Sequence, residues 1–108
     1  MLNQRITELL NQQINMELFS AYLYLDMANY YSEEGLNGFE NWFYIQAQEE
    51  RDHAMLIRTY MLNNSEKVVF EAIGKPGIEY KSFDGPLKEA LEHERFITDS
   101  INTIYVVV

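Results

Sequence analysis

Residues 43–61 read FYIQAQEERDHAMLIRTYM, and the spacing of their apolar side chains predicts a helix with charge inside its apolar stripe. Steps of three and four residues, which mark one face of a helix, lead from Phe43 to Ile57. Glu50 and His53 occupy two positions of that series at which apolar residues are expected. Their i, i+3 spacing directs both side chains from one helical turn toward the same point, as a shared ligand would require.

The same periodicity recurs on both sides of this stretch. The sequence therefore predicts three long helices, over about residues 2–31, 39–64 and 83–105. Two glycines and an asparagine within residues 35–38 predict a short turn, which places the first two helices antiparallel. Residues 66–82 contain two glycines and a proline that break any helix. Such a segment can reach roughly 55 Å when extended, which is long enough for an overhand crossover along a helical bundle.

The composition of the chain limits its possible partners. Its 108 residues predict a single domain over residues 1–108. Only 8 basic residues stand against 17 acidic ones, and the net charge of -9 argues against nucleic acid and anionic membranes. The absence of cysteine excludes disulfides, Cys-based zinc sites and iron–sulfur clusters. The polar start has no leader pattern, and no apolar run approaches the roughly 20 residues of a membrane span. We therefore expect a soluble, cytoplasmic, all-α protein.

Each of the other two expected helices also carries a carboxylate within its apolar stripe. Glu17 interrupts the stripe of the first helix, and Glu94 interrupts that of the third. A lone buried carboxylate costs several kcal/mol unless it is paired or binds a cation, and Arg51 and Arg58 fall off the stripe. Three carboxylates with one imidazole suit iron or manganese, and zinc less specifically. Because diiron-carboxylate bundles combine a Glu-x-x-His unit with single glutamates from other helices, the pattern predicts a metal site.

Simpler interpretations exist for individual residues. Glu17 could be partly exposed, and Tyr24, two turns away, could be a core aromatic whose hydroxyl finds a partner. Glu49 is most simply surface charge, His53 alone could be a boundary histidine, and His93 falls off the stripe and is expected to be solvated. A second apolar face of the first helix could be additional core or could pack against other chains. That face comprises Leu9, Met16, Phe19, Leu23 and Met27.

With these residues in register on three helices, the chain resembles bacterial non-haem ferritins. The resemblance runs from the N-terminus to about residue 102 and rests on four stretches. They are INMELFSAYLYLDMANYY (14–31), NGF (37–39), FYIQAQEERDHAMLIRTYM (43–61) and LEHERFITDSIN (91–102). The fold that this resemblance implies is an all-α, ferritin-like helical bundle with a long crossover between its second and third helices.

The resemblance also implies a role for each candidate residue. The implied ligands of a diiron ferroxidase centre are Glu17, Glu50, His53 and Glu94. Glu50 would bridge the two irons, Glu94 would serve the second iron, and the remaining two ligands would complete the first. Tyr24 would lie beside the centre and could donate a hydrogen bond or an electron. Glu49 would belong to the additional iron site of the bacterial members.

The function implied by the resemblance is that of a ferroxidase which stores iron. Family members oxidise Fe(II) with oxygen or peroxide and keep the ferric mineral inside a homo-oligomeric shell. They also have a fourth long helix, whereas this sequence stops at Val108 and its ending IYVVV departs from the family pattern. The chain could be truncated or frameshifted, could complete the bundle with another copy, or could receive the helix from a different protein.

Three rival functions follow from the same residues. The first is a catalytically impaired chain that binds a cation and assembles without turnover. The second is a rubrerythrin-like peroxide scavenger, which the absence of cysteine disfavours. The third is a structural bundle without metal, in which replacing the buried glutamates by glutamine or leucine should stabilise the fold.

Overall fold

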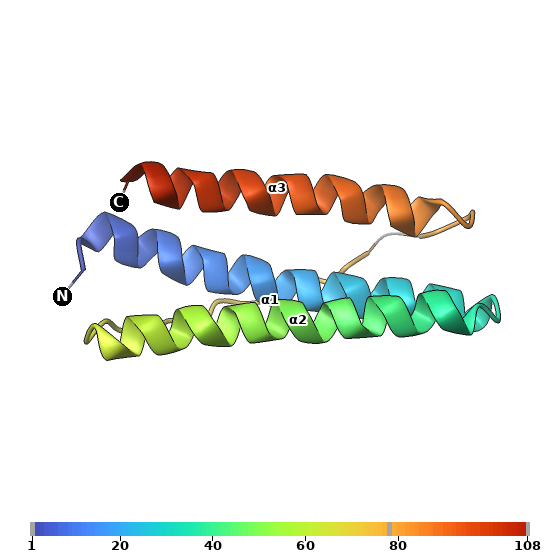
Figure 1. The fold of residues 1–108 in the computed structure, drawn as a ribbon, viewed down its shortest axis with the longest axis horizontal. Coiled ribbons are helices and arrows are strands. Elements are labelled where there is room, and N and C mark those ends of the chain that lie inside the picture. The colour runs from blue at the N-terminus through green and yellow to red at the C-terminus, as the bar shows by residue number, and fades with distance from the viewer. Residues whose placement is uncertain (1, 78, 108) are drawn as a thin grey trace.

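The computed structural model describes the backbone of residues 2–77 and 79–107, and the side chains of these residues up to 104. Three helices follow one another, α1 (Gln4–Glu33), α2 (Asn37–Asn63) and α3 (Gly85–Val107). They lie side by side along the long axis of a body that measures 49 × 21 × 21 Å (Figure 1). The expected all-α fold is confirmed. The helix α3 continues two residues beyond its expected end at 105, and Val108 lies outside the described residues.

The hairpin of α1 and α2 is the best-packed part of the fold. The side chain of Asn3 caps α1 by accepting a hydrogen bond from the backbone N–H of Arg5 at 2.7 Å. Gly35 has a φ of 74°, a left-handed conformation that glycine adopts without strain, and it reverses the chain between the helices. Near this turn, the rings of Tyr31 and Phe43 stack with their centroids 5.5 Å apart. The short turn and the stacked rings fix the register of the two helices.

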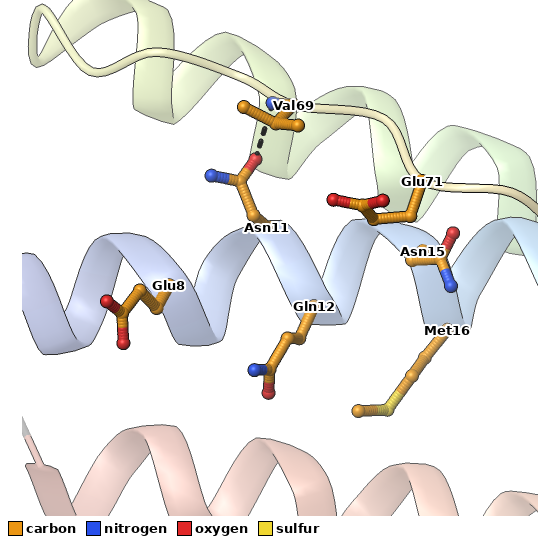
Figure 2. A pocket seen from close by; sticks show the side chains of 7 residues that line it. All are labelled: Glu8, Asn11, Gln12, Asn15, Met16, Val69 and Glu71. Carbon is orange, nitrogen blue, oxygen red and sulfur yellow. Dashed lines mark hydrogen bonds between the residues drawn. The ribbon is translucent and has the colours of Figure 1, made fainter.

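The crossover, residues 64–84, leaves the end of α2 and returns along the hairpin to the start of α3 (Figure 1). One side chain of α1 holds its first part. The Asn11 amide donates a hydrogen bond to the Lys67 carbonyl at 3.2 Å, and its carbonyl accepts one from the Val69 N–H at 2.9 Å. Figure 2 shows the hydrogen bond between Asn11 and Val69, two of the residues that line a 460 Å³ pocket between α1 and the crossover. The overhand crossover expected from the sequence is therefore present.

Within the described residues, the backbone of α3 approaches that of α1 but not that of α2. Within the described part of the chain, no Cα atom of α3 lies within 8 Å of a Cα atom of α2. Leu23 and Met27 of α1 form one core cluster with Ala90 of α3, so this second apolar face of α1 is additional core. Between α2 and α3 lies an open groove, which we call the α2–α3 groove. Its apolar end, about 350 Å³, is lined by Gly38, Phe39, Trp42 and Leu87.

None of the three helices, over the residues described, is both long enough and apolar enough to cross a membrane.

Candidate metal centre

Three predicted site residues meet in the middle of the hairpin. Glu17 lies on α1, and Glu50 and His53 lie one turn apart on α2. One ligand atom of each lies within 4.8 Å of the other two. The His53 Nδ1 atom is 3.5 Å from Glu50 Oε2 and 3.8 Å from Glu17 Oε2. Two carboxylates and an imidazole thus converge on one point, as the stripes on the two helices predict. We call these three residues the triad.

The triad is buried on one side and open on the other. Glu17 is 2% exposed and Glu50 is 5% exposed, whereas the side chain of His53 is 54% exposed. The expectation that His53 points into the core is therefore wrong. The backbones of α2 and α3 stay too far apart for α3 to cover His53, and this part of α2 faces the α2–α3 groove. An ion at the triad could be reached from solvent through that groove.

The carboxylate of Glu17 is only half satisfied. Its Oε1 accepts a hydrogen bond from Gln13 Nε2 at 3.0 Å, while its Oε2 is buried and accepts no hydrogen bond from a nitrogen or hydroxyl group of the described residues. Among the described residues, no lysine or arginine forms an ion pair with Glu17 or Glu50. A buried carboxylate oxygen without a donor is unfavourable by several kcal/mol. A cation between the triad residues would supply the missing charge, so this donor set fits a hard or borderline metal ion.

The ionisation of Glu50 reflects the same lack of positive charge. Burial, followed by the nearby carboxylates of Glu17 and Glu94, raises the pKa of Glu50 from 4.5 to about 9. At neutral pH the metal-free side chain therefore keeps its proton. Because a metal ligand must be deprotonated, a bound dication would displace that proton.

Glu94 reaches the groove from α3 without joining the triad. Its Oε1 accepts a hydrogen bond from the hydroxyl of Tyr24 on α1. Burial and this carboxylate raise the pKa of the Tyr24 phenol, which therefore stays protonated and continues to donate. Glu94 is exposed, in contrast to the buried position expected from its stripe, because α2 does not cover this side of α3.

The α2–α3 groove still brings the predicted residues together. One 430 Å³ section of it is lined by Tyr24, Glu49, Glu50, His53 and Glu94. Within this section Glu49 is exposed, and it is not a member of the triad. The groove thus places every predicted residue except Glu17 along one wall or the other, and Glu17 lies beneath them next to His53 and Glu50.

Two contacts of the site were not found from the sequence. Gln13, one turn before Glu17 and fully buried, orients that carboxylate. His93 was expected to be solvated, and this is wrong. It is half-buried, and its Nε2 lies 2.5 Å from the hydroxyl oxygen of Ser20. Burial also lowers the pKa of His93. A signal for both existed in the polar residues at positions 13, 17, 20 and 24, which share one face of α1.

Comparison with known proteins agrees with this geometry. Residues 7–108 match the model of the ferritin-like domain, and the chain belongs to this family. The bacterial non-heme ferritin of Campylobacter jejuni subsp. jejuni is 38% identical over 104 residues, which cover 96% of this chain and 62% of that protein. The bacterial non-heme ferritin of Staphylococcus epidermidis is 37% identical over 98 residues, covering 91% of this chain and 59% of that protein. The resemblance stated from the sequence is confirmed.

Solved structures show the same relationship. An open-pore ferritin from the hyperthermophilic archaeon Archaeoglobus fulgidus superposes with a TM-score of 0.92 at 38% identity, covering 95% of this chain and 63% of that one. An engineered closed form of the Archaeoglobus fulgidus ferritin also gives a TM-score of 0.92, with 96% and 63% covered. The chain therefore spans about three fifths of the length of the ferritins that it matches.

Proposed function

We propose that this chain binds Fe(II) at Glu17, Glu50 and His53 and oxidises it to Fe(III), as one subunit of a cytoplasmic, iron-storing homo-oligomer. The observation that carries the proposal is the convergence of Glu17, Glu50 and His53, whose ligand atoms lie within 4.8 Å of one another. Among the described residues, no lysine or arginine pairs with the two buried carboxylates. Membership of the ferritin-like family supports iron as the metal. Carboxylate ligands favour the ferric product, because their charge stabilises the higher oxidation state.

Each residue has a defined part in the proposed reaction. Gln13 holds one oxygen of Glu17, so that the other oxygen faces the substrate ion. Glu50 releases its proton when the ion binds. Two Fe(II) ions together would give two electrons to one O2, which takes up two protons and leaves as hydrogen peroxide, or to one hydrogen peroxide, which takes up two protons and leaves as two waters. Glu94, held by the hydroxyl of Tyr24, would serve a second iron, and Glu49 would serve an additional one along the same groove. The net charge of -9 would raise the local concentration of Fe(II).

A second candidate is metal binding and assembly without turnover. It is favoured by one observation: only three of the four expected ligands converge, while Glu94 lies outside the triad. A site with one iron per chain would bind and release Fe(II) without rapid oxidation. The two functions differ in the number of ions bound and in the consumption of oxygen.

An anaerobic Fe(II) titration followed by exposure to air distinguishes them. The ferroxidase proposal expects two Fe(II) per chain and rapid oxidation, both abolished in the double variant Glu50→Ala, His53→Ala. Asp52→Ala is the control, because Asp52 is an exposed acid of the same helix turn outside the triad. One Fe(II) per chain with oxidation no faster than in buffer would establish the second candidate. Equal iron binding by the double variant and the unchanged chain would contradict both.

A further inference from the structure

Two side-chain hydrogen bonds join α1 to α3 in the described part of the chain. Ser20 pairs with His93, and Tyr24 pairs with Glu94. The donors and acceptors are arranged as neighbours on both helices, since Ser20 and Tyr24 are one turn apart and His93 directly precedes Glu94. Because the backbone of α3 approaches only α1 over the described residues, its position depends chiefly on contacts with α1.

The direction of the first hydrogen bond follows from the hydroxyl of Ser20. That hydroxyl is completely buried and donates its single hydrogen to the Met16 carbonyl at 2.8 Å. It can therefore only accept from His93, and the proton of the pair belongs to His93 Nε2. This assignment holds for the neutral and the charged imidazole alike. The ring of His93 is further fixed by Phe19 and Tyr24, whose ring centroids lie 5.8 and 6.0 Å from its own.

The hydrogen bond between Ser20 and His93 constrains the position of the Glu94 carboxylate through the register of α3. A shift of α3 by one residue would move its side chains by about 1.5 Å along the axis and rotate them by about 100°. Either movement would separate His93 from Ser20 and Glu94 from Tyr24 together. We propose that Ser20 and His93 are positioning residues, which hold α3 in the register that brings the Glu94 carboxylate to Tyr24 and the metal centre. The part that concerns the metal rests on the proposed function.

The test compares four single variants with the unchanged chain. Ser20→Ala and His93→Phe each remove the hydrogen bond, whereas His93→Gln keeps an N–H donor near the position of Nε2. Ser100→Ala is the matched control. The Ser100 hydroxyl also donates to a carbonyl four residues earlier, that of Phe96 at 3.1 Å, but within the described residues it bonds to no other helix.

Two readouts are needed, one of them without metal. The first is the hydrogen-bonded phenol signal of Tyr24 in the metal-free protein, obtained by ultraviolet resonance Raman spectroscopy as a difference from Tyr24→Phe. The second is the affinity for Co(II), used as a spectroscopic probe. Ser20→Ala and His93→Phe should lose the Tyr24 signal and bind Co(II) about 10–100-fold more weakly at the site that uses Glu94. His93→Gln and Ser100→Ala should retain both.

An unchanged Tyr24 signal in folded Ser20→Ala would overturn the proposal, as would an equal loss in Ser100→Ala. If His93→Phe does not fold, Ser20→Ala still decides, because it removes a single oxygen atom. Circular dichroism establishes that each variant is folded. The metal-free signal does not depend on iron chemistry, so a chain that shows the Tyr24 effect and yet does not oxidise Fe(II) would refute the proposed function and leave the positioning role intact.

Discussion

Glu50 and Glu17 lie side by side and buried, and no lysine or arginine among the described residues pairs with them. In the metal-free protein, the favourable solution is a proton on Glu50, which removes one of the two charges. The same arrangement favours a dication, because the ion neutralises both carboxylates at once. The metal-free fold therefore favours a protonated Glu50, whereas metal binding favours a deprotonated Glu50.

The pH dependence of stability should report this proton. The folded state keeps it up to about pH 9, whereas the unfolded state releases it above about 4.5. The free energy of unfolding of the metal-free chain should therefore fall as the pH rises between these values, by at most about 1.4 kcal/mol per pH unit. Urea denaturation at pH 6 and pH 8 measures the slope. The affinity for Co(II) should change in the opposite direction and rise with pH.

Glu50→Gln provides the matched variant, because glutamine keeps the shape and cannot ionise. In this variant, we expect the free energy of unfolding to fall less steeply with pH and to be higher at pH 8. We also expect loss of Co(II) binding at the triad. Glu40→Gln, at a partly buried glutamate in the first turn of the same helix and away from the triad, should leave the slope unchanged. The same slope in Glu50→Gln and the unchanged chain would show that another group titrates.

The sequence predicted the triad because each member interrupts a regular apolar stripe. Regular spacing on two antiparallel helices is enough to bring Glu17 opposite Glu50 and His53. It was not enough for Glu94 and His93, since their surroundings depend on how α3 is rotated against α1 and on the lack of contact with α2. His53 is exposed for the second of these reasons, because the backbone of α3 does not approach that of α2.

At the scale of the elements, the crossover depends on few contacts. Asn11 uses both ends of its amide on the backbone at Lys67 and Val69, and Figure 2 shows the hydrogen bond with Val69. Replacing it by alanine should lower the free energy of unfolding by about 1 kcal/mol. The amide of Val69 should lose its protection from hydrogen exchange, measured by mass spectrometry of the segment or by NMR.

Asn15→Ala is the control for this variant. Asn15 lines the same pocket from α1, and no hydrogen bond of its side chain is found among the described residues. Removing the Asn15 side chain should leave the hydrogen exchange of the Val69 amide unchanged. It should change the free energy of unfolding by no more than a few tenths of a kcal/mol. If Asn11→Ala leaves the exchange at Val69 unaltered, the crossover is held by other contacts.

Helix periodicity predicted all three helices and the length of the crossover, since both follow from composition along the chain. The path of the crossover could not be predicted in the same way. Its first part is held by a polar side chain on a helix rich in polar residues, and nothing in the sequence distinguishes Asn11 from Gln12 or Asn15. Its last part is held by the hydroxyl of Tyr31, which donates a hydrogen bond to the Phe83 carbonyl at 2.6 Å.

The whole molecule is more open than its size requires. Its accessible surface is 7058 Å², whereas a compact chain of this mass would expose about 6300 Å². The radius of gyration is 15.3 Å, against about 13 Å for a compact domain of this length. Much of the apolar surface in the α2–α3 groove belongs to Phe39, Trp42 and Leu87. Assembly would cover such a surface, in agreement with the proposed homo-oligomer.

Trp42 offers a direct measure of that coverage, because it is the only tryptophan and is 51% exposed. As the protein concentration rises, its fluorescence should shift to shorter wavelength and become less sensitive to acrylamide, in parallel with the mass from sedimentation. Leu91→Lys in the groove should prevent both changes, whereas Leu62→Lys, which does not line the groove, should not. Association with Trp42 still accessible would show that another face is covered.

The attachment of α3 to α1 alone has a consequence for the order of folding. All three triad residues belong to two helices joined by a short turn, so their contacts close a shorter loop than the contact of Tyr24 with Glu94 and can form earlier. Glu94 arrives only after a long loop has closed. A metal ion captured by the hairpin would stabilise it by mass action before the third helix docks. Folding followed by stopped flow should then show a Co(II)-dependent early phase, and its absence would place metal capture after docking.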